Sequence, residues 1–361
     1  MIAHLSRTTL VLLLLALPAL HGIASETEPP ALKPQAGPLD AGAGFAFARK
    51  PEEPRQALSG IACPAVAKAP GLCLAVFDEG GEARYLTIEG QAIRPKAERV
   101  VLLAGTVELD GEAAATDGTF YYVAASQSAK RGKCKSNPES RHLIRFRLDP
   151  ETGRGKRGNG GTLVDFTDTG ALWTLMRSVP GLKEHVGDGM CLGTTGEGKN
   201  GVNIEGMAVR DGRLNFGFRG PVGKDGARIL SVDAKALFEG GPADPKLFNV
   251  ALGKGRSIRD LIAVSDGILV LAGPDDDEDN EKRGFTVSRW NGQGGQDNLK
   301  PLATLDLDGV PRRNCSEKIK RKEIKPEALA VLGDKPGQPY QAVVFSDGLC
   351  DGGALRFNIP R

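Results

Sequence analysis

Residues 204–220, IEGMAVRDGRLNFGFRG, decide the fold. The segment contains an acidic residue, Glu205, then a short apolar run, the pair Asp211-Gly212, a second apolar run and finally Arg219. Asp-Gly between two apolar runs is typical of a tight β-hairpin, because both turn positions tolerate a positive φ. The two strands return the chain to where it began, so we expect Glu205 and Arg219 to lie together at the end opposite the turn.

The same order of residues recurs along the chain. It is found in residues 110–126 (DGEAAATDGTFYYVAAS), 258–275 (IRDLIAVSDGILVLAGPD) and 325–348, where the hairpin loop is longer. A degenerate copy, residues 59–80, lacks the acidic residue. Such repetition is typical of radially repeated β folds. We therefore predict one all-β, β-propeller-like domain over residues 59–361, with about five to six blades of antiparallel strands.

Little helix is expected, apart from a helical stretch near Ala171 to Arg177. The 48 glycines suit many tight turns between short strands better than long helices. Segments such as HLIRFRLD and FTVSRWN alternate apolar and polar residues, as half-buried outer strands do. The long gap between Glu112 and Glu205 must contain an insertion or an unrecognised blade.

The first residues are typical of a secretory signal peptide. Arg7 precedes an apolar run from Leu10 to Leu20, and the small residues Ala24 and Ser25 follow. The run is too short for a membrane-spanning helix, which needs roughly 20 apolar residues. We predict a signal peptide over residues 1–24, a flexible lead-in over residues 25–58 and a periplasmic or secreted protein without a membrane span.

All six cysteines follow the predicted signal peptide. An even number in an oxidising compartment favours disulfides, although six cysteines allow 15 pairings. We prefer sequential pairing, because each bridge then closes a loop within one or two neighbouring units. The predicted disulfides are Cys63–Cys73, Cys134–Cys191 and Cys315–Cys350.

Two resemblances to known families follow from these motifs. The combination IEGMAV…GRLNFGFRGPV, followed by ILVLAGPDDD, resembles the bacterial domain of unknown function family 3616 (DUF3616), from roughly Leu109 to the end. More distantly, the E-G-x-A…D-G rhythm is similar to that of the esterase-like phytase propellers, which are associated with phosphoester hydrolysis. The first resemblance implies a propeller architecture, and neither supplies a catalytic residue.

The hairpin copies also predict where a ligand would bind. If the hairpins are the inner strands of successive blades, their acids gather around one mouth, with cations among them. The candidate ligand-binding residues are Glu112, Glu205, Arg219, Arg259, Asp260, Lys325 and Glu327. The alternative is structural, because acids beside a strand often accept hydrogen bonds from the neighbouring blade.

Several kinds of chemistry are disfavoured. After the signal peptide only His142 and His185 remain, which disfavours a multi-histidine zinc site and a histidine-nucleophile phosphatase. No G-x-S-x-G segment presents a serine nucleophile. The acidic run 275–279 fails as an EF-hand loop, because Asn280 occupies its sixth position and Thr286 its twelfth.

Three functions remain open. The first is recognition of a small or polymeric ligand at the propeller rim. The second is phosphoester hydrolysis, with rim carboxylates holding a divalent cation such as calcium. The third is a structural envelope module that binds protein partners. A nucleic-acid partner is not indicated, because 47 Lys and Arg nearly balance 45 Asp and Glu.

Overall fold

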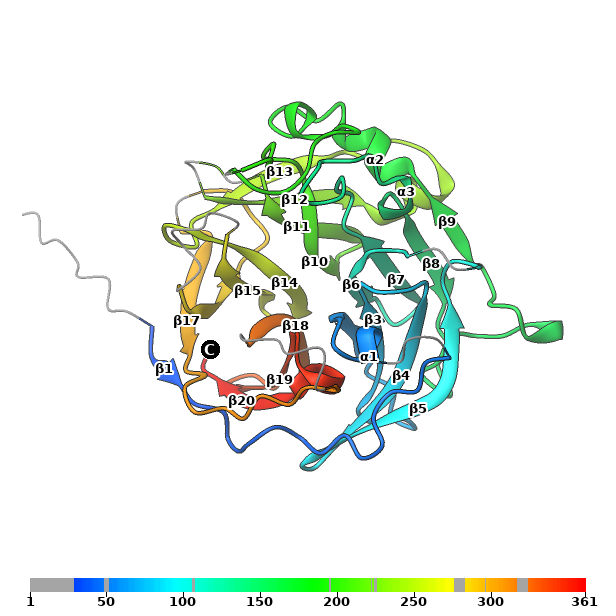
Figure 1. Cartoon of the computed structure of the whole chain (residues 1–361), viewed down its shortest axis with the longest axis vertical. Helices are drawn as coiled ribbons and strands as arrows, with labels where there is room; N and C mark the ends of the chain where they lie inside the picture. The colour runs from blue at the N-terminus through cyan, green and yellow to red at the C-terminus, as the bar shows by residue number, and fades with distance from the viewer. Residues whose placement is uncertain are drawn as a thin grey trace, which may run out of the picture.

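The computed structural model describes residues 29–48, 52–105, 108–194, 196–221, 223, 226–275, 283–295, 297–316 and 324–361. These residues form five sheets, which Figure 1 shows as blades around a common centre. The fold is an all-β, five-bladed propeller. The gap between Glu112 and Glu205 contains an insertion rather than a sixth blade among the described residues.

Each blade is built from antiparallel strands in chain order. Blade 1 contains β2 (Leu58–Ala62), β3 (Leu72–Phe77), β4 (Glu82–Glu89) and β5 (Ala92–Val101). Blade 2 contains β6 (Gly111–Thr116), β7 (Phe120–Ala125), β8 (Leu143–Arg147) and β9 (Thr167–Thr169). Blade 3 contains β10 (Asn203–Arg210), β11 (Arg213–Gly220), β12 (Ala227–Asp233) and β13 (Lys246–Val250).

The last two blades follow the same plan with changes at their edges. Blade 4 contains β14 (Arg256–Val264), β15 (Gly267–Pro274), β16 (Phe285–Trp290) and β17 (Leu299–Leu305), and β1 (Ala31–Leu32) pairs in parallel with β17. Blade 5 contains β18 (Lys325–Gly333), β19 (Tyr340–Asp347) and β20 (Leu355–Ile359). The described α-helices are short: α1 (Glu52–Arg55), α2 (Ala171–Met176) and α3 (Ala234–Glu239). Helix α2 occupies the segment predicted to be helical.

The predicted hairpins are the two inner strands of each blade. The Asp-Gly pairs at Asp117, Asp211 and Asp266 connect β6 to β7, β10 to β11 and β14 to β15. Asp211 and Gly212 both have a positive φ, 51° and 73°, as the hairpin argument requires. At the other two turns the positive φ falls on the glycine, at Gly118 and Gly267.

The apolar core is divided among the five junctions between blades. One buried cluster lies between each pair of neighbours, such as Met207 and Phe216 of blade 3 against Tyr122 and Leu143 of blade 2. The inner strands of neighbouring blades also contact one another around the whole ring, including β18 of the last blade with β2 of the first. Each blade is therefore stabilised by its two neighbours, as expected of radial repeats.

Every inner strand has a β-bulge near its start. The register with the second strand shifts across Ser59, Glu112, Glu205, Arg259 and Glu327. Such a bulge leaves one residue unpaired and redirects its side chain. The five bulge residues therefore occupy equivalent positions around the propeller axis.

The residue after the bulge lies against the backbone of the next blade. A Cβ on Gly60 would come within 2.9 Å of the Ala113 backbone, and one on Gly206 within 2.7 Å of the Asp260 backbone. These approaches are shorter than side chains tolerate. Glycine at these positions lets adjacent inner strands pack closely at the axis.

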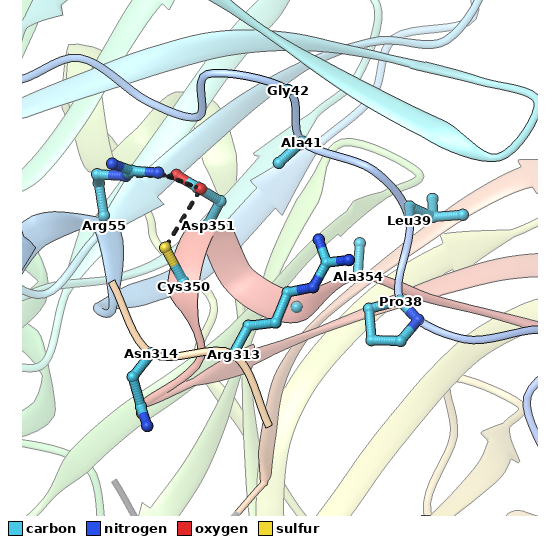
Figure 2. Close-up of a pocket in the computed structure, with 11 residues that line it drawn as sticks. Pro38, Leu39, Ala41, Gly42, Arg55, Arg313, Asn314, Cys350, Asp351 and Ala354 are labelled. Carbon is cyan, nitrogen blue, oxygen red and sulfur yellow. Dashed lines mark hydrogen bonds and ion pairs between the residues drawn. The ribbon is translucent and has the colours of Figure 1, made fainter. Parts of the chain in front are cut away.

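The first and last blades are joined near the chain ends. Gln56 and Gly348 exchange hydrogen bonds, in which Gln56 Nε2 donates to the Gly348 carbonyl and Gly348 N–H donates to the Gln56 carbonyl. Figure 2 shows Arg55 and Asp351 pointing toward each other, with an Nη2–Oδ2 distance of 2.6 Å. Asp351 is buried and also accepts a hydrogen bond from Phe45 N–H. These contacts close the ring.

The segment predicted to be a flexible lead-in is hydrogen-bonded to the blades where the structure describes it. Besides β1, Gln35 and Leu39 donate backbone hydrogen bonds to the carbonyls of Arg356 and Ala354, along β20. Residues 35–39 thus run along the outer strand of three-stranded blade 5. The predicted signal peptide, residues 1–24, lies outside the described residues.

The three predicted disulfides are present: Cys63–Cys73, Cys134–Cys191 and Cys315–Cys350. The first connects β3 with the end of β2, and the third connects the segment before β18 with the turn after β19. The second links the loop between β7 and β8 with the segment that precedes β10. No helix among the described residues has the length and apolar character needed to cross a membrane.

We predict that Gly206→Ala destabilises the propeller by about 1–3 kcal/mol, because the added methyl forces the inner strands of blades 3 and 4 apart. Urea unfolding measures the loss. Gly37→Ala is the control, since a Cβ there has no atom within 4 Å. Equal stability of the two variants would contradict the close packing at the axis.

Candidate axial ligand site

A polar cavity of about 340 Å³ lies at the end of the propeller where the inner strands begin. Its wall includes bulge residues of three blades, Glu112, Glu205 and Glu327, together with Arg219 and Lys325. The structure therefore brings together five of the residues selected from the sequence. Arg259 contacts two of them, with Nη1 3.5 Å from Glu205 Oε2 and 3.1 Å from Glu327 Oε1.

Asp260 does not line the cavity, which corrects the prediction that it joins the other acids. Its carboxylate accepts hydrogen bonds from the backbone N–H groups of Leu261 and Leu329, at 2.7 and 2.6 Å. Leu329 belongs to blade 5, so Asp260 ties two blades together. Asp260 and Glu205 precede their Asp-Gly turns by the same number of residues, so the sequence pattern treats them as equivalent. In the structure the β-bulges fall on Glu205 and Arg259, so Arg259 is the residue equivalent to Glu205.

Glu205 is the centre of a buried ion-pair network. Its Oε1 lies 3.1 Å from Arg219 Nη1, as the hairpin geometry predicts, and its Oε2 faces Arg259. Burial opposes ionisation of Glu205, but the two guanidinium groups outweigh it and hold its pKa below the usual value. Glu205 is thus an anion at neutral pH.

Other carboxyl groups of the cavity have raised pKa values. Burial, reinforced by the charge of Asp347, raises the pKa of Glu327 to about 8 despite its contact with Arg259. Burial raises the pKa of Asp110 to about 6. Burial and neighbouring carboxylates raise the pKa values of Asp78 and Glu112 well above their usual range. This part of the cavity has more acid groups than nearby cations can stabilise.

Sequence reasoning missed part of the wall. Asp347 ends β19, the second strand of blade 5, and the hairpin pattern already aligns it with Arg219 of blade 3. Asp78 directly follows β3, the second strand of blade 1, and the same pattern could have identified it. The loop after β7 was missed for lack of a repeat signal, and it brings Lys130, Arg131 and Asn137 to the cavity. Glu108, Asp110, Ser128 and Asn203 complete the missed polar residues.

Some buried polar atoms of the wall have no hydrogen-bond partner among the described residues. They include Oδ1 of Asp78 and Oδ1 of Asn203. Asn203 is 7% exposed. Burying a polar atom without a partner costs free energy, which a ligand with matching groups would recover.

The cavity carboxylates do not form a compact metal site. Within the described part of the chain, the residues whose potential ligand atoms lie within 4.8 Å of one another are Cys315, Cys350 and Asp351, and those cysteines form a disulfide. Neither histidine lines the cavity. His142 contacts Asp168, and His185 Nδ1 lies 2.8 Å from the Asn200 carbonyl oxygen.

The chain matches one family model. Residues 183–349 match "Protein of unknown function (DUF3616)". This confirms the resemblance to DUF3616 predicted from the hairpin motif, over a segment that begins later than Leu109. The resemblance to esterase-like phytases stays a prediction. No curated protein matches the chain.

Solved structures with a similar chain path were found at low identity. The glutaminyl cyclase of Myxococcus xanthus is 12% identical, covering 92% of this chain and 100% of that chain, with a TM-score of 0.44. Regucalcin of Agrobacterium tumefaciens, a calcium-binding protein, is 13% identical, covering 91% and 95%, with a TM-score of 0.37. The PQQ-bound aldose sugar dehydrogenase of Streptomyces coelicolor is 13% identical, covering 92% and 94%, with a TM-score of 0.36. Function is therefore inferred from the cavity.

The raised pKa of Glu327 predicts a pH dependence of stability. The unfolded chain releases this proton near pH 4.5 and the native protein near pH 8, so the native state binds more protons between these values. Its free energy of unfolding should therefore fall as pH rises across this window. Glu327→Gln should flatten the slope measured by urea unfolding, whereas Glu151→Gln, an exposed acid, should not. An unchanged slope in Glu327→Gln would show that this carboxyl titrates normally.

Glu205 should instead be needed for stability. Glu205→Gln leaves Arg219 and Arg259 buried with less compensating charge, which costs about 3–5 kcal/mol for a broken buried pair. Chemical denaturation at pH 7 measures the loss against Glu151→Gln. A loss below about 1 kcal/mol would mean that the network is solvated in solution.

Proposed function

We propose that this propeller is a binding module whose axial cavity takes a small organic cation. The observation that carries the proposal is the group of carboxyls with raised pKa values at the axis, above all Asp78 and Glu112. A positive ligand group would lower these pKa values and supply the hydrogen-bond donor that Asp78 Oδ1 lacks among the described residues. The cavity volume of about 340 Å³ suits a small molecule rather than a folded partner.

An organic cation suits this wall better than a hard metal ion. Calcium takes 6–8 oxygen ligands at about 2.3–2.6 Å, which requires oxygens gathered within roughly 5 Å of one another. Among the described residues, no three carboxylates of the cavity have oxygens gathered that closely. Ammonium and guanidinium groups carry several donors and reach separate acceptors at about 2.7–2.9 Å.

A purely structural role explains the cavity less well. Asp260 shows how an acid serves structure here: burial raises its pKa well above the usual range as well, but two backbone N–H groups donate hydrogen bonds to its carboxylate. Asp78 and Glu112 have no such backbone donors among the described hydrogen bonds, and burial together with neighbouring carboxylates raises their pKa values, so ionising them opposes folding. Groups that cost stability and cluster in a cavity are typical of functional sites.

Phosphoester hydrolysis is the second candidate. Lys130, Arg131, Arg219 and Lys325 line the same cavity and could hold a phosphate group beside a carboxylate-bound cation. This reaction requires the cavity carboxylates to move closer to one another so that they can bind the metal ion. Assays with a generic phosphomonoester and added calcium distinguish it from simple binding.

Export remains part of the proposal. The three disulfides fit an oxidising compartment, such as the periplasm or the exterior. The signal-peptide pattern of residues 1–24 supports the same location. Amino-terminal sequencing of the protein from the periplasm or medium should find a start near Ser25 or Glu26.

We expect the protein to bind cadaverine or agmatine in calorimetric titrations at pH 7, with release of protons to the buffer. Asp78→Asn and Glu112→Gln should each weaken binding about tenfold or more, because each removes a charged hydrogen-bond partner. Glu151→Gln is the matched control. The proposal fails if neither amine binds at millimolar concentration, or if calcium binds and supports phosphomonoester hydrolysis.

A further inference from the structure

The axial cavity has no aromatic ring among the described residues that line it. Its apolar residues are Ala129 and Leu192, and every other described lining residue is polar or charged. Proteins recognise quaternary ammonium groups through aromatic cages, in which the cation contacts the faces of Phe, Tyr or Trp rings. A cation in this cavity would instead be held through hydrogen bonds and charge.

One polar residue of the wall is an amide whose oxygen has no partner. Asn203 is 7% exposed, and its Oδ1 has no hydrogen-bond partner among the described residues. Asn203 begins β10, two residues before Glu205, and both residues line the cavity. The amide is neutral, so it adds an acceptor to the wall without adding to the cluster of acids.

The hairpin explains why this oxygen is unpaired. Asn203 is paired across the hairpin with Gly220, which has no side chain to donate a hydrogen bond. The equivalent residue of blade 2 is Asp110, two residues before Glu112, and it accepts a hydrogen bond from Ser126 Oγ. Blade 3 therefore lacks a donor that blade 2 supplies. An unpaired buried acceptor costs free energy, which a donor from a ligand would recover.

Acceptors enter the cavity from several blades. Asp78 follows β3 of blade 1, Glu112 belongs to β6 of blade 2, and Asn203 belongs to β10 of blade 3. An ammonium group carries three N–H donors and a guanidinium group carries five. A trimethylammonium group has the same charge and no N–H donor, so it can satisfy none of these acceptors. The number of donors on the cation should therefore decide how tightly it binds.

We infer that the axial cavity selects cations with N–H donors, namely protonated primary amines or guanidines, over quaternary ammonium ions, and that the amide oxygen of Asn203 is a specificity determinant. This inference rests on the proposed function and specifies its ligand. Carboxylates attract both kinds of cation through charge, whereas Asn203 can bond only to a donor. The amide thus adds selectivity that charge alone does not give.

The test compares two dications that differ in their N–H donors. Cadaverine is compared with its counterpart in which both ammonium groups are trimethylated, by calorimetric titration of the mature full-length protein at pH 7 and fixed ionic strength. We expect cadaverine to bind about tenfold or more tightly, the usual value of a charged hydrogen bond.

Variants at Asn203 separate its oxygen from the size of the ligand. Asn203→Leu keeps the branched shape and removes the amide, so it should weaken cadaverine binding about tenfold and leave the methylated ligand unchanged. Asn203→Asp keeps an oxygen acceptor and should bind cadaverine equally or more tightly. Asn249→Leu is the control, because Asn249 is exposed on β13 of the same blade and does not line the cavity.

Urea unfolding distinguishes a binding role from a structural one. Asn203→Leu should be as stable as the wild type or more stable, because it removes an unpaired buried acceptor. A marked loss of stability would show that the amide serves the fold and would overturn its assignment to the ligand.

The binding outcomes separate the two proposals. Equal binding of the two dications would overturn the selection for N–H donors and leave the organic-cation site standing. Failure of both to bind would overturn both proposals. Selectivity that persists in full in Asn203→Leu would show that ligand size causes it, and a loss in Asn203→Asp as large as in Asn203→Leu would exclude the acceptor role.

Discussion

The close approach of the inner strands determines the rest of the molecule. Five strands can surround one axis only if their backbones nearly touch, as Gly60 and Gly206 allow. A β-bulge precedes each of these contacts and directs one side chain away from the hydrogen-bonded pairing of the first and second strands. The same constraint that closes the ring therefore places Glu112, Glu205 and Glu327 around one cavity.

Burial and neighbouring charges then give the carboxyl groups at these equivalent positions different pKa values. Burial disfavours the charge of Glu205, but Arg219, and then Arg259 at one of the five equivalent positions, hold its pKa below the usual value. Glu112 lies nearer to other acids and has a raised pKa. One ring of equivalent positions thus contains both a stabilising network and a group of strained charges. A binding site gains affinity from such charges because a ligand relieves a cost that the native state already bears.

The repeat could be predicted from the sequence because it depends on local chemistry. Asp-Gly turns between apolar runs identified the inner hairpins and the start of each inner strand. The sequential disulfides followed from the same spacing. The pattern predicts five to six blades rather than a single number, because the insertion between β9 and β10 has no hairpin signal and resembles a missing unit. Asp260 was misplaced because β14 has one more residue between bulge and turn than β10.

The remaining cavity residues depend on contacts that are distant in sequence. Lys130 and Arg131 follow a strand of blade 2, and a disulfide to Cys191 fixes their loop near the start of β10. No local pattern reveals that a basic loop will line the same cavity as carboxylates of blades 1 and 5. A propeller can thus change its ligand through one loop, while the bulges that build the ring stay the same. In this chain that loop brings Lys130 and Arg131 to a cavity wall that also contains Asp78 and Asp347, so one segment without a repeat signal alters the charge of a site built by the repeat.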